Sequence, residues 1–192
     1  MTGRTHDLAA ITALGAVAFV HAPLSMTLST LLVAVLANQI GGITPDIDQP
    51  TAPLWRNLPE GKIFGKAFDK SVGGHRFITH SIVGAVLFGF IAHWLLKFLH
   101  PIMPGVNIGY VWWAFMIGLA SHLVMDTFTK EGVPWLLPIP IKFGLPPLKS
   151  LRITTGKAVE TFGVFPALLI ANIWFYSSHY QAVLSFFRHR IT

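Results

Sequence analysis

The stretch GGHRFITHSIVGAVLFGFIAHWLLKFL, residues 73–99, begins with a polar cluster and continues as a long apolar segment. An apolar run of about 20 residues can cross the hydrocarbon core of a bilayer as one helix. Histidine and arginine directly before the start of such a helix serve either as a signal for membrane topology or as part of a functional site. The apolar part of this stretch therefore indicates a membrane protein, and the polar part raises a separate question.

The composition of the whole chain supports a membrane-embedded fold. Apolar residues make up 53% of the 192 residues and charged residues only 11%, whereas soluble domains carry about 25% charged residues. The length suits one domain, so we predict a single membrane-embedded domain over residues 1–192. Cysteine is absent, which excludes thiolate metal sites, disulfides and cysteine nucleophiles.

Hydrophobic patterning predicts an all-α integral membrane protein with a bundle of about five transmembrane helices. The expected helices are residues 6–20, 25–42, 77–99, 108–128 and 158–178. Two long polar loops, residues 43–75 and 129–157, connect them. The second loop contains VPWLLPIPIKFGLPP, whose five prolines exclude a regular helix and favour extended chain against the membrane face.

The first apolar run has a second interpretation as a signal peptide, because Arg4 precedes it and VHA resembles a cleavage site. Asp7 lies where such a peptide should be positive, and another apolar run follows almost at once. We therefore favour a retained helix.

Alternation of the five helices would gather the charged residues on one side of the membrane. The amino terminus and both long loops share that side and hold 11 of the 14 basic residues, so the positive-inside rule predicts that they lie in the cytoplasm. All eight carboxylates fall at the same end. The positive-inside rule does not require this, because acids contribute little to orientation.

Histidines and carboxylates at the cytoplasmic helix ends form a candidate metal site. His122 and Asp126 have the i, i+4 spacing that puts both side chains on one helix face, as have Arg76 and His80. Nitrogen and oxygen ligands without sulfur suit one or two divalent ions, Zn²⁺ first and Mn²⁺ or Fe²⁺ as alternatives. The predicted metal ligands are His6, Asp46, His80, His122, Asp126 and Glu160, and the predicted catalytic residues are Arg76, Asp48 and His75.

Each of these residues also has an ordinary structural interpretation. An isolated HxxxD is usually a hydrogen-bonded pair, Asp46 could cap a turn, and Glu160 could complement the amino end of its helix. Arg76 could be a topology anchor. What these separate readings do not explain is why all of the residues converge on one membrane face, so we favour the metal site.

A metal site of this kind points to hydrolysis, with Arg76 steadying negative charge on a phosphoester. The expected partners are membrane lipids and a lipid or membrane-proximal phosphoester substrate. A non-enzymatic protein, either a transporter or metal-handling protein or a regulatory scaffold, is the alternative. Nucleic acid is not expected as a partner, because the basic residues are scattered rather than aligned on one helix face.

Five motifs follow one another in an order that resembles a known family: MTGRTH, TPDIDQP, GHRFITHS, SHLVMDTFTKEGVPWLLP and TGKAVE. They resemble the LexA-regulated, inner-membrane-associated, metal-dependent hydrolases of bacteria. This resemblance implies an inner-membrane location and expression in the SOS response, and it covers all nine predicted site residues. Two positions depart from the family pattern: Phe77 replaces a glycine and Gln49 replaces a histidine.

The chain is more distantly similar to the zinc-dependent phospholipase C and P1 nuclease group, which shares the HxxxD motif. Gly156 stands where the HxxxE motif of that group would need its histidine. The similarity therefore implies one or two metal ions rather than three, and it favours lipid phosphodiesters as substrates.

Overall fold

The computed structural model describes residues 1–21, 26–71, 73, 76–139 and 141–191, and within them the chain is helical with two isolated β-bridges. Five long elements form the bundle: α1 (Gly3–His21), α2 (Leu28–Ile43), α5 (Ile82–Leu99), α6 (Ile108–Thr127) and α7 (Phe165–Ser178). Shorter elements are η1 (Pro45–Asp48), α3 (Pro53–Arg56), α4 (Gly61–Ser71), η2 (His100–Ile102), η3 (Lys149–Leu151), the π-helical turn η4 (Val159–Val164) and α8 (Tyr180–Ile191).

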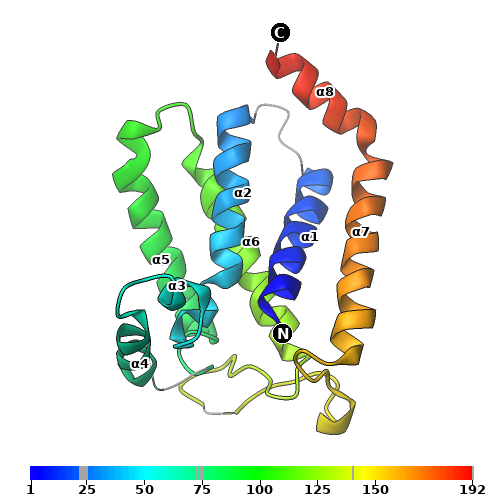
Figure 1. The fold of residues 1–192 in the computed structure, drawn as a ribbon. Helices are drawn as coiled ribbons and strands as arrows, with labels where there is room; N and C mark the ends of the chain where they lie inside the picture. The colour runs from blue at the N-terminus through cyan, green and yellow to red at the C-terminus, as the bar shows by residue number, and fades with distance from the viewer. Residues whose placement is uncertain (22–25, 72, 74–75, 140, 192) are drawn as a thin grey trace.

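Helix α6 is the centre of the bundle, with α2, α1 and α5 packed around it. Residues at i, i+4 spacing on α6 form its buried stripe: Val111, Phe115, Leu119 and Leu123. Helix α7 is attached through α1 and stands at the edge of the bundle (Figure 1). Among the long helices described, α6 therefore has the largest number of buried residues, and it carries two of the predicted ligands.

Three of the five predicted spans have the length and hydropathy of membrane-crossing helices. They are Ile82–Ile102, Ile108–Thr127 and Val159–Ser178, and α2 is a shorter apolar helix. Consecutive long helices alternate in direction, so the amino terminus and both long loops lie at one end and the carboxyl terminus lies at the other (Figure 1). The all-α membrane fold is thus confirmed.

Helix α5 begins at Ile82, five residues after the predicted start at Phe77. The hydroxyl of Ser81 caps its amino end by accepting a hydrogen bond of 3.1 Å from the Gly84 amide. Residues 76–81 form a turn instead of the first helical turn. The polar cluster therefore lies outside the apolar helix, directly before its first turn.

The two long loops differ in structure. Residues 43–71 contain η1, α3 and α4, short helices that were not predicted within this polar loop. Helix α4 packs closely there, because a side chain at Gly65 would meet Pro50 and Trp55 at 2.9–3.0 Å. The proline-rich loop is irregular as predicted, with isolated bridges that pair Thr129 with Ile153 and Val133 with Phe143. Both loops lie below the bundle, at the end where the amino terminus lies (Figure 1).

Candidate metal centre

The structure brings five predicted ligands from four elements into one buried group. His6 comes from α1, Asp46 from η1, His80 from the turn before α5, and both His122 and Asp126 from α6. Two sets of three donor atoms lie within 4.8 Å of one another, namely His6 with His122 and Asp126, and Asp46 with His80 and His122. His122 belongs to both sets, so they form one cluster.

Four donor atoms of this cluster have nearly equal spacing. The Nε2 atoms of His80 and His122 each lie 3.6 Å from Asp126 Oδ2, and they lie 3.7 and 3.6 Å from Asp46 Oδ1. Spacings of 3.6–3.7 Å are close to the separation of about 3.4 Å expected between two atoms that bind one zinc ion at roughly 2.0–2.2 Å with a tetrahedral angle. These four pairs therefore offer nitrogen and oxygen donors for one divalent ion.

The orientation of His122 supports this fit. Its Nδ1 lies 2.6 Å from the Gly42 carbonyl oxygen, which assigns the proton to Nδ1. In a neutral imidazole Nε2 is then the acceptor atom, and it is fully buried without a hydrogen-bond partner in the described part of the chain. Because it faces two carboxylate oxygens, a cation between them would relieve the repulsion.

His80 is held from behind in the same way. Its Nδ1 lies 3.0 Å from the Thr79 hydroxyl and 3.5 Å from Asp48 Oδ2, so Nε2 points toward Asp46 and Asp126. Burial alone would lower the pKa of His80, but the carboxylates of Asp126, Asp48 and Asp46 outweigh it and raise the pKa. A carboxylate behind a histidine is the usual support of a metal-bound imidazole.

The turn before α5 is built around Asp48. Asp48 Oδ2 accepts hydrogen bonds from the Arg76 amide at 2.9 Å and from the Thr79 hydroxyl. Arg76 has a φ of 58°, which is unusual for a residue with a side chain, and such backbone strain is often found at functional sites. Gly73 has a φ of 84°, and a Cβ there would lie 2.4 Å from the Phe77 ring. Phe77 therefore packs against the glycine that starts the turn.

Asp126 is the most heavily contacted carboxylate of the group. Arg76 Nη2 lies 2.6 Å from Oδ2, and the α-amino group of Met1 and the Nε2 atom of His6 contact Oδ1. Arg76 also donates a hydrogen bond to Thr129 Oγ1 at 2.9 Å and lies 3.4 Å from Glu131. Arg76 thus fixes Asp126 and extends the site toward the exposed Glu131.

One predicted ligand, Glu160, is not part of this group, and the predicted catalytic residue Asp48 lies at its edge. Glu160 accepts hydrogen bonds from Thr2, Thr5 and Gly156, so its carboxylate joins η4 to the amino end of α1 instead of facing the cluster. His75 lies outside the described residues. Asp48 stands behind His80 and not among the donor atoms, which makes it a positioning residue.

The sequence analysis missed Thr79 and Gly42, both of which hold a histidine in place. Thr79 lies inside the motif GHRFITHS, and a hydroxyl next to a predicted ligand was the available signal. Gly42 acts through its backbone carbonyl, for which a single sequence has no signal. Two other histidines lie apart from this group: the His93 side chain is exposed, and His179 Nδ1 lies 2.9 Å from the Phe175 carbonyl oxygen.

Comparison with known proteins identifies the family. Residues 1–187 match the family described as YdjM inner membrane protein. Protein YvsG of Bacillus subtilis (strain 168) is 30% identical over 178 residues, which are 92% of this chain and 94% of YvsG. Inner membrane protein YdjM of Escherichia coli (strain K12) is 30% identical over 139 residues, 69% of this chain and 61% of that protein.

YdjM of Shigella flexneri matches to the same extent. No solved structure matches the chain. The extent of these matches confirms the inner-membrane part of the resemblance found in the sequence, while LexA control and hydrolysis are not part of the names of these relatives. The chain belongs to the YdjM inner membrane protein family.

Proposed function

We propose that the protein is a metal-dependent hydrolase whose active site faces the cytoplasm at the inner membrane. The observation that carries the proposal is the convergence of four donor atoms from Asp46, His80, His122 and Asp126 at spacings of 3.6–3.7 Å. Two of the four come from HxxxD on the best-buried helix, and both histidines have their second nitrogen occupied. Zn²⁺ is the ion that best fits an N₂O₂ set of this size.

The residues around the donor atoms have different proposed roles. A divalent ion held here would supply Lewis-acid catalysis for hydrolysis. Asp48 and Thr79 orient His80, and the Gly42 carbonyl orients His122. Arg76 positions Asp126 and contributes a buried positive charge. That charge suits a phosphoester better than a neutral amide, because guanidinium recognises phosphate oxygens in pairs.

The position of the centre in the fold favours a substrate that resides in the membrane. Asp126 is the second-last residue of α6, and His80 precedes α5 by two residues. Both therefore lie where membrane-crossing helices meet the interface, at the level of lipid headgroups. The proposed substrate is a phosphoester of a lipid.

Metal content and its link to hydrolysis test this function directly. Protein purified in mild detergent is expected to contain at least one transition-metal ion per chain by elemental analysis. Hydrolysis of a chromogenic phosphodiester and of phosphatidylglycerol should stop after chelation and return with added Zn²⁺. Folded protein without metal, or hydrolysis that survives chelation, would remove the basis of the proposal.

The cytoplasmic orientation of the site can be tested by labelling. The chain has no cysteine, so single cysteines can be placed at two exposed lysines, Lys62 on α4 and Lys97 on α5. In intact cells a membrane-impermeant maleimide should label Lys97→Cys and should reach Lys62→Cys only after lysis. The reverse pattern would put the site on the periplasmic face, and labelling of both in intact cells would contradict the helix alternation.

A further inference from the structure

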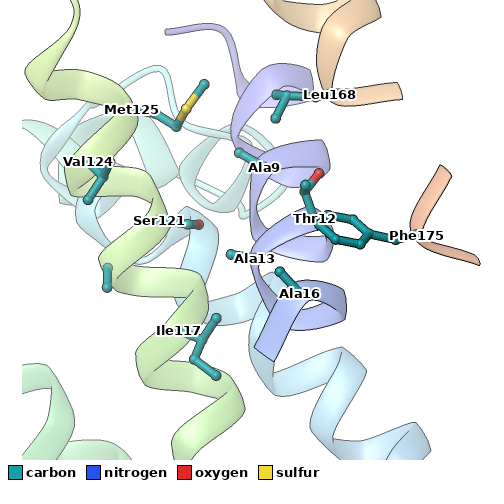
Figure 2. Close-up of a pocket in the computed structure, with 11 residues that line it drawn as sticks. Ala9, Thr12, Ala13, Ala16, Ile117, Ser121, Val124, Met125, Leu168 and Phe175 are labelled. Carbon is teal, nitrogen blue, oxygen red and sulfur yellow. The ribbon is translucent and has the colours of Figure 1, made fainter. Parts of the chain in front are cut away.

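A cavity of about 540 Å³ lies between α1, α6 and α7. Helix α7 packs mainly on α1 and makes few direct contacts with α6, which leaves a wedge-shaped space on that side of the bundle. Small side chains of α1, namely Ala9, Ala13 and Ala16, face Ile117 and Met125 of α6 across this space (Figure 2). A volume of this size lies within the range of about 300–1,000 Å³ that is usual for small-molecule sites.

The cavity wall is almost entirely carbon, although two hydroxyl-bearing residues line it. The Thr12 hydroxyl donates to the Leu8 carbonyl at 2.7 Å and accepts from Asn172 Nδ2 at 2.6 Å. The Ser121 hydroxyl donates to the Gly118 carbonyl at 2.7 Å. Because both hydroxyls are satisfied within the helices, the cavity suits a hydrocarbon and disfavours a polar ligand.

The cavity lies next to the candidate metal centre along both α1 and α6. Ser121 and Met125 each directly precede a ligand on α6, and Ala9 lies one helical turn after His6 on α1. The ten steps from His6 to Ala16 span about 15 Å of helix, which is half of the roughly 30 Å hydrocarbon core. The cavity thus extends along the two helices from near the level of the metal centre toward the bilayer midplane.

We propose that this cavity holds one acyl chain of a membrane phospholipid whose phosphoester lies at the metal centre. The position of the phosphoester at the metal centre rests on the proposed function, whereas the position of the acyl chain rests on the cavity alone. A chain gains little by moving from bilayer to cavity, because lipid tails are as apolar as the cavity wall. The cavity acts instead by orientation: it fixes the chain so that the phosphoester is presented to the donors in one position.

Photo-crosslinking tests the chain site without any assay of hydrolysis. The wild-type protein is placed in nanodiscs with a phosphatidylglycerol that carries a diazirine halfway along one acyl chain. After irradiation, mass spectrometry should find the main crosslinks in the peptides with residues 9–16 and 117–125. Crosslinking that is mainly on the lipid-facing surface of α5, around the exposed Phe90 and Trp94, would overturn the proposal.

A matched pair of variants separates cavity binding from random contact with lipid. Ala13→Phe fills the cavity and is expected to reduce crosslinking in these peptides about fivefold or more, as expected when a small-to-large change occupies a site. Leu36→Phe makes a comparable change on the exposed face of α2, where Leu36 is 64% exposed, and should leave the crosslinks as they are. Equal crosslinking of Ala13→Phe and wild type would refute the cavity as the chain site.

The same variants keep this inference separable from the proposed function. Metal content of Ala13→Phe equal to that of wild type shows that the bundle is folded, so a loss of crosslinks then supports the chain site. Crosslinks in the cavity of a protein that hydrolyses no phosphoester would uphold the chain site and reject the hydrolase. Hydrolysis without crosslinks in the cavity would uphold the hydrolase and reject the chain site.

Discussion

Alanine in place of His122 is expected to leave less than about a tenth of an equivalent of metal per chain and to lower phosphodiester hydrolysis by roughly a thousandfold. His122 is shared by both groups of donors in the cluster, and its Nε2 lies 3.6 Å from two carboxylate oxygens. Its removal takes one of the two imidazoles away from Asp46 and Asp126, so that fewer donor atoms remain to bind a cation. Elemental analysis and a chromogenic assay on the same preparation measure both effects.

The matched control is His93→Ala, which removes an exposed histidine from α5. It should retain the metal and the activity of wild type. Asp48→Asn provides an intermediate case, because Asp48 supports His80 from behind and lies outside the donor set. Loss of such a support typically weakens metal binding about 10–100-fold. If His93→Ala and His122→Ala lose metal to the same degree, the cluster is not the metal site.

Much of the bundle could be predicted from the sequence, because membrane helices leave a strong local signal. Apolar length and helix alternation placed His6, His122 and Asp126 at the same end before any contact was known. Figure 1 shows the alternating helices, with the amino terminus and both long loops at one end. The i, i+4 spacing of His122 and Asp126 was sufficient to put both on one face of α6. These features depend on residues that are close together in the sequence, so they can be predicted from the sequence alone.

The details of the centre could not be predicted, since they depend on which atoms meet across long sequence separations. Glu160 is a carboxylate at the same end of the bundle as the ligands. Its oxygens, however, accept hydrogen bonds from Thr2, Thr5 and Gly156. Asp46 and Asp48 are only two residues apart in η1, but they lie on opposite sides of the His80 ring. Asp46 faces Nε2 and Asp48 faces Nδ1. Chain direction and composition contain no information on such choices.

A methyl group at Gly118 is expected to be among the most damaging single changes in the bundle. A Cβ at this position would lie 2.0 Å from the Asn38 carbonyl oxygen, and one at Gly41 would lie 2.1 Å from the Phe115 carbonyl oxygen. The obstacles are backbone atoms, which cannot rotate away as a side chain can. Overpacking usually costs about 1–3 kcal/mol, and rigid neighbours put Gly118→Ala at the upper end of that range or above it.

The effect of Gly118→Ala should also reach the metal centre. Helices α2 and α6 approach closely at this point, and small residues allow such contacts in membranes. Asn38 adds a hydrogen bond of 3.0 Å to the Ala114 carbonyl. One turn further along, the Gly42 carbonyl holds His122 Nδ1 at 2.6 Å. Separation of the two helices would therefore release the histidine that both donor groups share.

The measurement is the thermal unfolding midpoint by circular dichroism in detergent, together with metal content. Gly118→Ala should lower both, whereas Gly163→Ala, where an added Cβ has nothing within 4 Å, should lower neither. An unchanged midpoint for Gly118→Ala would contradict the close approach of α2 and α6. A lowered midpoint with full metal content would mean that His122 keeps its orientation without Gly42, so the support of the centre would have to come from α1 and the turn before α5 instead.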